Sequence, residues 1–224
     1  MTKKELIDAI VEKEWAMFHS VNGDDRTDCQ EDRRGFELMR RAQYDAWDEA
    51  TNAAWYDDLC TAEAEGRNLA REKYIRMMKA TDPRGYEAFC SELPPVSEEK
   101  AALVRALWGI FLVQTRRMRE KYPLVALGGR PTMAFEEEDG WASVETYQTS
   151  ESLTYSETTL KALLAHAQAL EAQGVDLVTE IQRNTMVALG FNSLEDAELT
   201  FARHTKELPG FLGVRCSRCA GDDR

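Results

Sequence analysis

The sequence has no long hydrophobic run and no segment that resembles a signal peptide. Its longest apolar stretch, from Ala106 to Val113, has eight residues, whereas a membrane-spanning helix needs about 20. Near the N-terminus, Asp8, Glu12 and Glu14 interrupt the apolar region that a secretion signal would need. We therefore predict a cytoplasmic protein with no membrane partner.

Basic charge is also scarce. The 224 residues carry 28 Lys and Arg against 40 Asp and Glu, which gives a formal net charge of -12. A surface of this sign repels the phosphates of nucleic acids and of anionic lipids, so neither is an expected partner. The chain is nevertheless 43% hydrophobic, which is typical of a globular protein that is long enough to bury a substantial core.

Histidine is rare, and the cysteines do not form a disulfide framework. None of the three histidines lies in an HxxxH, HExxH or ExxH spacing, so we predict no metal site. The five cysteines are odd in number and unevenly spaced, which argues against paired disulfides. Cys216 and Cys219 form a single CxxC, but a structural zinc site needs four ligands. We interpret this pair as accidental, with a shared metal site or a redox pair as the alternatives.

The familiar cofactor and nucleophile motifs are absent. The sequence contains no GxGxxG or GxxxxGK[ST] loop for nucleotide phosphates. It contains no GxSxG turn for a serine nucleophile either. We therefore predict a protein without a cofactor.

Helical periodicity dominates what is present. Apolar residues recur at i, i+3, i+4 and i+7 through almost the whole chain, which is the pattern of amphipathic α-helices. It predicts helices near residues 3–20, 30–64, 67–80, 84–92, 97–121, 142–149, 156–173, 176–189 and 193–207. The expected fold is all-α, a single-domain irregular bundle of about eight or nine helices with a long second helix.

Start and stop signals support this division, and one long stretch interrupts it. Ser97 and Ser193 stand where N-caps are expected, and Gly66 and Gly174 stand where helices end. Residues 124–140 contain adjacent glycines, a proline and an acidic run. We expect a functional or partly mobile connection there, with room for a short strand at 124–127. We assign residues 1–208 to the globular domain and residues 209–224, with the CxxC, to a loosely held C-terminal tail.

Glu14 is a charged residue on the apolar side of the first predicted helix. It lies between Ile10 and Phe18, four residues away in each direction, and residues at that spacing share a helix face. A buried carboxylate is either paired with a cation or raised in pKa by desolvation. The first case gives a core salt bridge to an arginine of another helix. The second gives a general acid or base near neutral pH.

Arg40 and Gln43 repeat this pattern in the second predicted helix. They fall within an apolar stripe, between Phe36 and Trp47. Arg40 is a natural partner for Glu14, or for an anionic ligand that binds between helices. The alternative is a buried hydrogen-bond network that fixes how the helices cross.

Cys29 lies beside the expected start of the same helix. A helix N-terminus lowers the pKa of a thiol and favours the reactive thiolate. Five acidic residues between positions 24 and 32 oppose this effect because they raise the pKa of the thiol. Arg26, Arg33 and Arg34 offset them only in part. We therefore favour a buried or ligand-contacting cysteine over a nucleophile, and keep both interpretations open.

An ordered series of short motifs resembles a known family. The series runs from about residue 12 to residue 200 and comprises Glu14-Trp15-Ala16-Met17-Phe18, Cys29-Gln30-Glu31-Asp32, Met39-Arg40-Arg41-Ala42-Gln43-Tyr44, Trp47, Gly66-Arg67-Asn68-Leu69, Glu72-Lys73-Tyr74, Met77-Met78, Gly129-Arg130-Pro131, Glu145-Thr146-Tyr147 and Thr154-Tyr155-Ser156. Together these motifs resemble the uncharacterised family catalogued as domain of unknown function 4125. The family usually has Ser and Phe where this chain has Ala42 and Tyr44.

The resemblance implies a shared fold but supplies no activity. It includes the residues that helical periodicity singles out, Glu14, Arg40 and Gln43, together with the segment around Cys29. It adds polar and aromatic residues, namely Arg67, Asn68, Glu72, Lys73, Tyr74, Tyr147 and Tyr155. Such a set exceeds what packing alone requires and is similar to a pocket for a small polar or zwitterionic ligand.

We therefore predict a small-molecule-processing enzyme with a polar, metal-independent pocket between helices. Glu14 would be the general acid or base. Tyr147 or Tyr155 would orient the substrate or donate a proton, and Cys29 is a further catalytic candidate. An anionic or zwitterionic substrate would be held by Arg40 and Arg67, with Gln30, Gln43, Trp47, Asn68, Glu72, Lys73 and Tyr74 as the other binding residues. The alternative is a non-catalytic helical binding or interaction module whose buried polar residues form a structural network.

Overall fold

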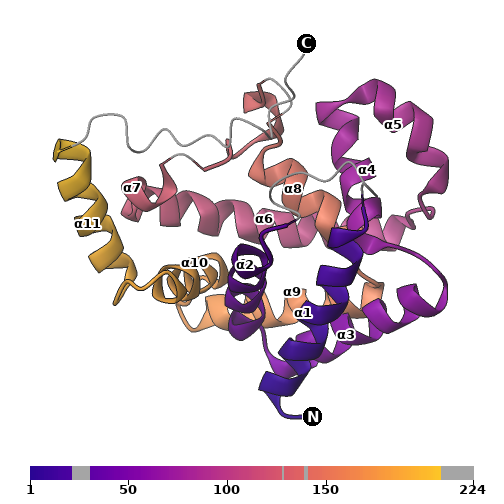
Figure 1. Cartoon of the computed structure of the whole chain (residues 1–224), viewed down its shortest axis with the longest axis horizontal. Helices are drawn as coiled ribbons and strands as arrows, with labels where there is room; N and C mark the ends of the chain where they lie inside the picture. The colour runs from indigo at the N-terminus through magenta and orange to yellow at the C-terminus, as the bar shows by residue number, and fades with distance from the viewer. Residues whose placement is uncertain (22–30, 128, 139–140, 208–224) are drawn as a thin grey trace.

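The computed structural model describes residues 1–21, 31–127, 129–138 and 141–207. In these residues the chain forms eleven α-helices, two short 3-10 helices and no strand (Figure 1). The predicted all-α fold is therefore confirmed, with more helices than the eight or nine that periodicity indicates. The tail at residues 209–224, with Cys216 and Cys219, lies outside the described residues.

The helices are spread over both halves of the chain. The first half of the chain contributes α1 (Lys3–His19), α2 (Arg33–Ala46), α3 (Glu49–Ala64), α4 (Leu69–Thr81), α5 (Pro83–Phe89) and the 3-10 helix η2 (Cys90–Glu92). The second half contributes α6 (Glu98–Lys121), α7 (Pro123–Ala126), the 3-10 helix η3 (Ala134–Glu136), α8 (Val144–Ser152), α9 (Glu157–Ala172), α10 (Leu177–Ala188) and α11 (Leu194–Glu207). In Figure 1, α4 and α5 lie at the right edge and α11 at the left edge.

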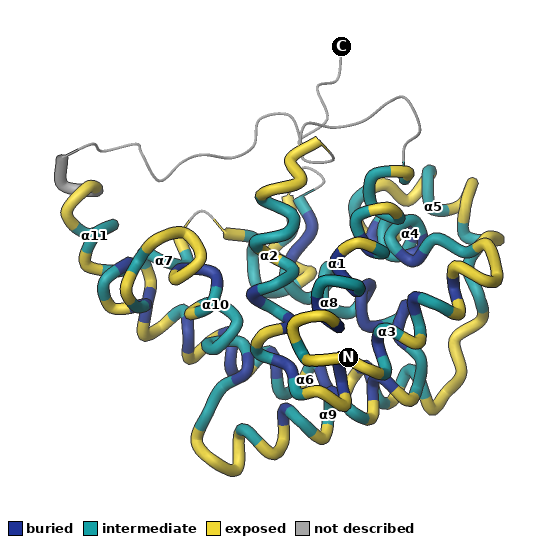
Figure 2. Tube along the Cα trace, turned by 60° about the horizontal axis from the view of Figure 1, so that its bottom comes forward, coloured by how far each residue is buried: buried dark blue, intermediate teal, exposed yellow. Residues whose placement is uncertain are grey.

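The main hydrophobic core lies where α1, α3, α6 and α9 meet. Figure 2 shows buried segments along the facing sides of these helices. Ile10, Leu59, Leu107, Leu160 and Leu163 are at most 1% exposed. Burying a side chain of this size is worth about 1.5–3 kcal/mol. The core therefore holds α1 and α3 against the α6–α9 pair and fixes the platform on which α2, α4 and α8 are placed.

A smaller hydrophobic cluster holds α11 at the edge of the molecule. It consists of Met118 and Tyr122 from α6 and its C-terminal cap, Met186 from α10, and Leu194 and Ala197 from α11. This cluster shares no buried residue with the main core. We conclude that α11 depends on its own local packing for its position.

The predicted helix boundaries at Ser97, Ser193 and Gly66 are confirmed. Ser97 Oγ accepts a hydrogen bond from the backbone N–H of Lys100 at 2.9 Å, and Ser193 Oγ accepts one from the N–H of Asp196 at 3.1 Å. Gly66 has a φ of 67° between α3 and α4, a conformation that costs glycine little and other residues more.

The prediction of a long second helix is wrong, because the helix is interrupted at Trp47. In place of one helix over residues 30–64, the described residues form two, α2 and α3, with Trp47 extended between them at φ -81° and ψ 152°. The Asp48 side chain caps α3 by accepting from the N–H of Thr51 at 2.8 Å. The end of α2 is closed by Lys3, whose Nζ donates to the carbonyls of Asp45 and Trp47, both at 2.8 Å. Among the helices that the structure describes, the longest is instead α6, with 24 residues.

The short strand suggested at residues 124–127 is also wrong. Pro123–Ala126 forms the helical turn α7. The backbone N–H groups of Leu124 and Val125, in the first turn of α7, donate to the Glu198 carboxylate of α11 at 2.8–3.0 Å. The contact with Glu198, 74 residues from Leu124 in the sequence, therefore stabilises a local structure that the sequence around it leaves open.

No helix in the described part of the chain is long and apolar enough to cross a membrane.

Candidate functional site

Four charged residues from four different helices meet inside the molecule. Glu14 is on α1, Arg40 on α2, Lys73 on α4 and Glu151 on α8, and we call this set the ionic network. Each of the four side chains is at most 12% exposed. Charges this deeply buried are tolerated when each has a partner of opposite sign and further hydrogen bonds.

Arg40 and Glu14 form a two-pronged ion pair. Arg40 Nε donates to Glu14 Oε2 at 2.8 Å, and Arg40 Nη2 donates to Glu14 Oε1 at 2.5 Å. This parallel arrangement is the strong form of an arginine–carboxylate contact. The predicted pairing of these two residues is therefore confirmed.

Two aromatic residues complete the surroundings of Glu14. The Tyr44 hydroxyl donates to Glu14 Oε1 at 2.5 Å, and Trp55 Nε1 donates to the same oxygen at 3.1 Å. Burial raises the pKa of Tyr44 well above its usual range, so its hydroxyl keeps the proton that it donates. Among the described residues, Oε1 thus has three donors and Oε2 has only one.

Glu151 links Arg40 to Lys73. Arg40 Nη1 donates to Glu151 Oε1 at 2.7 Å, and Lys73 Nζ donates to Glu151 Oε2 at 3.1 Å. Burial alone would raise the pKa of Glu151, but the two cations outweigh it and hold the pKa at about 2. Glu151 is therefore an anion at any physiological pH. Lys73 Nζ also lies 3.5 Å from the centre of the Tyr147 ring.

The ionic network is neutral as a whole, and Arg40 is fully occupied at its centre. Two carboxylates face two cations in the order Glu14, Arg40, Glu151 and Lys73. All five N–H groups of Arg40 donate to protein acceptors, the remaining two acceptors being Gln43 and the Tyr44 hydroxyl. The two carboxylates raise the pKa of Arg40 although burial opposes them. An anionic ligand at Arg40 would have to displace one of these contacts.

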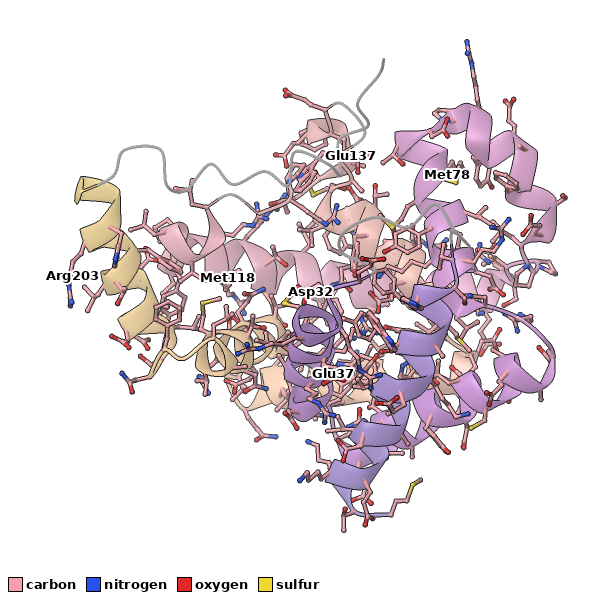
Figure 3. All side chains as sticks on the ribbon, in the orientation of Figure 1. Asp32, Glu37, Met78, Met118, Glu137 and Arg203 are labelled. Atoms are coloured by element: carbon pink, nitrogen blue, oxygen red, sulfur yellow. The ribbon has the colours of Figure 1, made fainter. Side chains whose placement is uncertain are left out.

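A cavity of about 410 Å³ lies beside the ionic network, between α1, α2, α4 and α8. We call it the α4 cavity. All four residues of the network line it, together with Tyr147 and an apolar wall that includes Met17, Phe18, Phe36, Leu69, Ala70 and Tyr74. Asp32, labelled in Figure 3 at the start of α2, lines it as well. Met39 belongs to the lining and is 53% exposed, so the cavity reaches the surface at α2.

Five of the residues predicted for the site line this cavity. They are Glu14, Arg40, Lys73, Tyr74 and Tyr147. They come from α1, α2, α4 and α8, segments that lie far apart in the sequence. The structure therefore brings together the proposed acid or base, one of the two proposed arginines and one of the two proposed tyrosines.

Three other predicted residues hold α4 in place rather than line the α4 cavity. Arg67 precedes α4 and donates from Nε and Nη2 to Glu72 at 2.8 and 3.0 Å, and it also pairs with Glu65. Asn68 caps α4 by accepting from the N–H of Arg71 at 2.9 Å. Its amide donates to the Met17 carbonyl at 2.8 Å, which ties the start of α4 to α1. Arg67 lines a separate cavity of about 420 Å³.

The last three described candidates lie on the other side of Arg40. Gln43, Trp47 and Tyr155 line a second cavity of about 490 Å³, which we call the α10 cavity because Val178, Ile181 and Gln182 of α10 line it. Arg40 and Tyr147 line both cavities. Burial raises the pKa of Tyr155 well above its usual range, so its hydroxyl keeps its proton.

Two candidates cannot be placed. Cys29 and Gln30 lie outside the described residues. So does Asp24-Asp25-Arg26-Thr27-Asp28, a DDxxD carboxylate spacing that the sequence reasoning passed over. Among the described residues no three His, Cys, Asp or Glu side chains gather closely enough to hold a metal ion.

Glu151 is the one member of the ionic network that the sequence analysis does not predict. The helix expected at residues 142–149 stops before it, whereas α8 continues to Ser152. A signal was present, because Glu151 follows Tyr147 by four residues and therefore shares its helix face. Tyr44 and Trp55 were missed for another reason. Their aromatic rings read as core residues, and only the structure places their polar atoms against Glu14.

Comparisons with known proteins give one match. Neither the curated proteins nor the solved structures contain a match to this chain. A family model described as "Protein of unknown function (DUF4125)" matches residues 4–199, which include all of the ionic network. The chain therefore belongs to the DUF4125 family.

Proposed function

We propose that the protein is a small-molecule-processing enzyme that acts at the α4 cavity. The observation that carries this proposal is that a buried, charge-balanced set of ionised side chains lines a cavity open to the surface. The cavity volume of about 410 Å³ lies within the range of about 300–1,000 Å³ that is typical of ligand sites. Buried charge of this kind costs stability, and a binding site is one reason for a protein to keep it.

The lining favours a ligand with an apolar body and one ionic or zwitterionic end. Phe18, Phe36 and Tyr74 offer adjoining aromatic surface in the cavity, where an apolar group would displace water. Lys73 and Glu151, which also line it, offer a cation and an anion next to each other. A zwitterion could contact both without leaving either charge unpaired.

Within the ionic network, Lys73 and Glu14 keep capacity for a ligand. An ammonium group has three N–H donors, and among the described residues Lys73 Nζ donates only to Glu151. Glu14 Oε2 accepts a single hydrogen bond from the described residues, so it retains a lone pair for a proton. We assign the polar group of the substrate to Lys73 and proton transfer to Glu14 Oε2. Tyr147, which stacks on Lys73, would orient the substrate.

A turnover assay against a mixed small-molecule pool tests this assignment. The purified protein is incubated with the small-molecule fraction of a cell extract, and mass spectrometry follows which species are consumed. We expect at least one species to disappear with the wild type and to disappear about 100-fold or more slowly with Glu14→Gln, the usual size of a general acid–base contribution. The exposed Glu120→Gln is the matched control and should keep the activity. Equal turnover by Glu14→Gln would refute the role of Glu14.

The second candidate is a non-catalytic module in which the ionic network serves the fold alone. The full occupation of Arg40 by protein acceptors favours it. Under this alternative the wild type consumes no species from the pool. Glu14→Gln would still lower the free energy of unfolding, by about 3–5 kcal/mol, because it leaves Arg40 buried with one partner fewer. The two candidates therefore differ in turnover and not in stability.

A cytoplasmic site of action is part of the proposal. Cys60 and Cys90 are free thiols, which is what a reducing compartment maintains. The net charge of -12 supports a small molecule rather than a nucleic acid as the partner.

A further inference from the structure

The α10 cavity differs in charge from the rest of the molecule. It has a volume of about 490 Å³ and lies between α2, α6, α8 and α10. Among the described residues, its lining contains Arg40, Arg119 and Arg130 but no aspartate or glutamate. The carboxylates of the ionic network neutralise Arg40. In a chain with a net charge of -12, a cavity with two further arginines and no acid is a local exception.

Arg119 and Arg130 have no ionic partner among the described residues. Their guanidinium groups contact backbone carbonyls instead, with Arg119 Nη2 donating to the Arg130 carbonyl at 2.5 Å and Arg130 Nη1 donating to the Ala142 carbonyl at 2.9 Å. These bonds hold both side chains in place without cancelling their charge. Burial lowers the pKa of Arg119, the opposite of what the carboxylates do to Arg40.

The nearest acidic residues are occupied by the connection that carries Arg130. Glu136 accepts from the N–H groups of Thr132 and Met133, both at 2.9 Å. Glu137, labelled in Figure 3 near the start of α8, accepts from the N–H of Ser143 at 2.7 Å and from its hydroxyl at 2.5 Å. Both carboxylates therefore stabilise the backbone. Their charges also act on the arginines through space, since Glu136 opposes the lowering of the Arg119 pKa and Arg130 helps to lower the pKa of Glu137. Neither carboxylate forms an ion pair with Arg119 or Arg130 among the described residues.

Two buried donors of the lining lack a protein acceptor. Trp47 is 2% exposed, and neither its Nε1 nor Arg119 Nε has a hydrogen-bond partner in the described part of the chain. A buried donor left alone costs about 1–3 kcal/mol. The lining also contains apolar side chains, among them Phe111, Val178 and Ile181.

We propose that the α10 cavity binds an organic anion, with its carboxylate or phosphate at Arg119 and Arg130 and its apolar body against Phe111 and α10. The two cations supply charge-assisted hydrogen bonds, which are the strong ones for such groups. This site does not rest on the function proposed for the α4 cavity, since the arginines that define it line only the α10 cavity.

Binding of defined anions tests the proposal. Isothermal titration at constant ionic strength would compare benzoate, phenyl phosphate and inorganic phosphate, with benzyl alcohol as the uncharged control. We expect saturable binding of benzoate or phenyl phosphate and none of benzyl alcohol. Binding of benzoate alone identifies a carboxylate site, and binding of both phosphates identifies a phosphate site. Absence of saturable binding by all three anions would overturn the proposal.

Substitutions locate the site on the molecule. Arg119→Gln and Arg130→Gln should each weaken binding of the preferred anion about tenfold or more, the equivalent of about 1.4 kcal/mol. Arg116→Gln removes the same charge from an exposed position on α6 and should leave binding unchanged. Equal binding by Arg119→Gln, Arg130→Gln and the wild type would place the anion elsewhere and refute the site.

A measurement on the wild-type protein covers the case in which these variants fail to fold. Phenylglyoxal modifies accessible guanidinium groups, and mass spectrometry identifies the modified arginines. The preferred anion should slow the modification of Arg119 and Arg130 several-fold and leave Arg116 unaffected. Protection of Arg116 to the same degree would show general screening by the anion and would contradict a specific site.

Discussion

At the scale of single residues, helical periodicity predicts the burial of some members of the ionic network and not of others. Apolar residues stand four positions before and after Glu14, so its burial follows from the sequence. The same pattern predicts that its partner Arg40 faces inward. Glu151 stands among polar residues, in the sequence Thr149-Ser150-Glu151-Ser152, and it is buried because α8 packs against α4 and α6.

Removing the charge of Glu151 should destabilise the protein. In Glu151→Gln the two cations, Arg40 and Lys73, stay buried, but the network keeps only the Glu14 carboxylate in place of two carboxylates. We expect the free energy of unfolding to fall by about 3–5 kcal/mol, measured by urea denaturation. The exposed Glu120→Gln is the control and should stay within about 0.5 kcal/mol of the wild type. Equal stability of the two variants would mean that the network does not hold the helices together.

The pKa of Glu151 gives a pH dependence with a definite sign. Its folded-state value of about 2 lies below the ordinary value of 4.5. The ion pairs of Glu151 therefore add stability above pH 4.5, and that contribution is lost as the pH falls from 4.5 toward 2. The full contribution is about 3 kcal/mol. The stability gap between the wild type and Glu151→Gln should narrow between pH 5 and pH 3, and a constant gap would contradict the assignment.

At the scale of elements, the break between α2 and α3 sets the geometry of both cavities. The apolar pattern continues through Trp47, so periodicity alone predicts one continuous helix. A local signal existed in Asp48 followed by Glu49, an N-cap with an acidic first turn. The contact of Lys3 with the end of α2 spans more than 40 residues, and no local pattern predicts it.

The cap at Asp48 should be measurable. Asp48→Ala removes the acceptor for the Thr51 N–H and should cost about 1 kcal/mol in free energy of unfolding. Asp48→Asn keeps a capping oxygen and should cost much less, which separates the cap from the charge of Asp48 beside His166. If both variants lose the same stability, the charge and not the cap is what matters.

At the scale of the whole molecule, the all-α class was predictable and the meeting of helices was not. Periodicity of 3.6 residues and serine caps indicate each helix locally. Which helix faces meet depends on contacts between segments far apart in the chain, such as Arg40 with Glu151 at a separation of 111 residues. The candidate site was therefore predictable as a set of inward charges, but its division into two cavities was not.

The two hydrophobic clusters predict unequal local stability. The centre of α9, from Leu160 to Ala167, belongs to the main core, whereas α11 rests on the smaller cluster at the edge of the molecule. Amide hydrogen exchange should be slowest in α9, and α11 should exchange by local opening at a lower free energy. Exchange of α11 at the rate of α9 would show that the molecule opens only as one unit.

The central claim is that the α4 cavity holds a small molecule, and affinity selection tests it most directly. The protein is incubated with the small-molecule fraction of a cell extract, free molecules are removed, and the retained species are identified by mass spectrometry. Ala70→Phe fills part of the cavity without altering the ionic network, and Ala70→Ser keeps the volume of its lining. We predict at least one species with an apolar body and an ionic end that the wild type and Ala70→Ser retain and Ala70→Phe loses. Retention of the same species by all three proteins, or of none by the wild type, would contradict the claim.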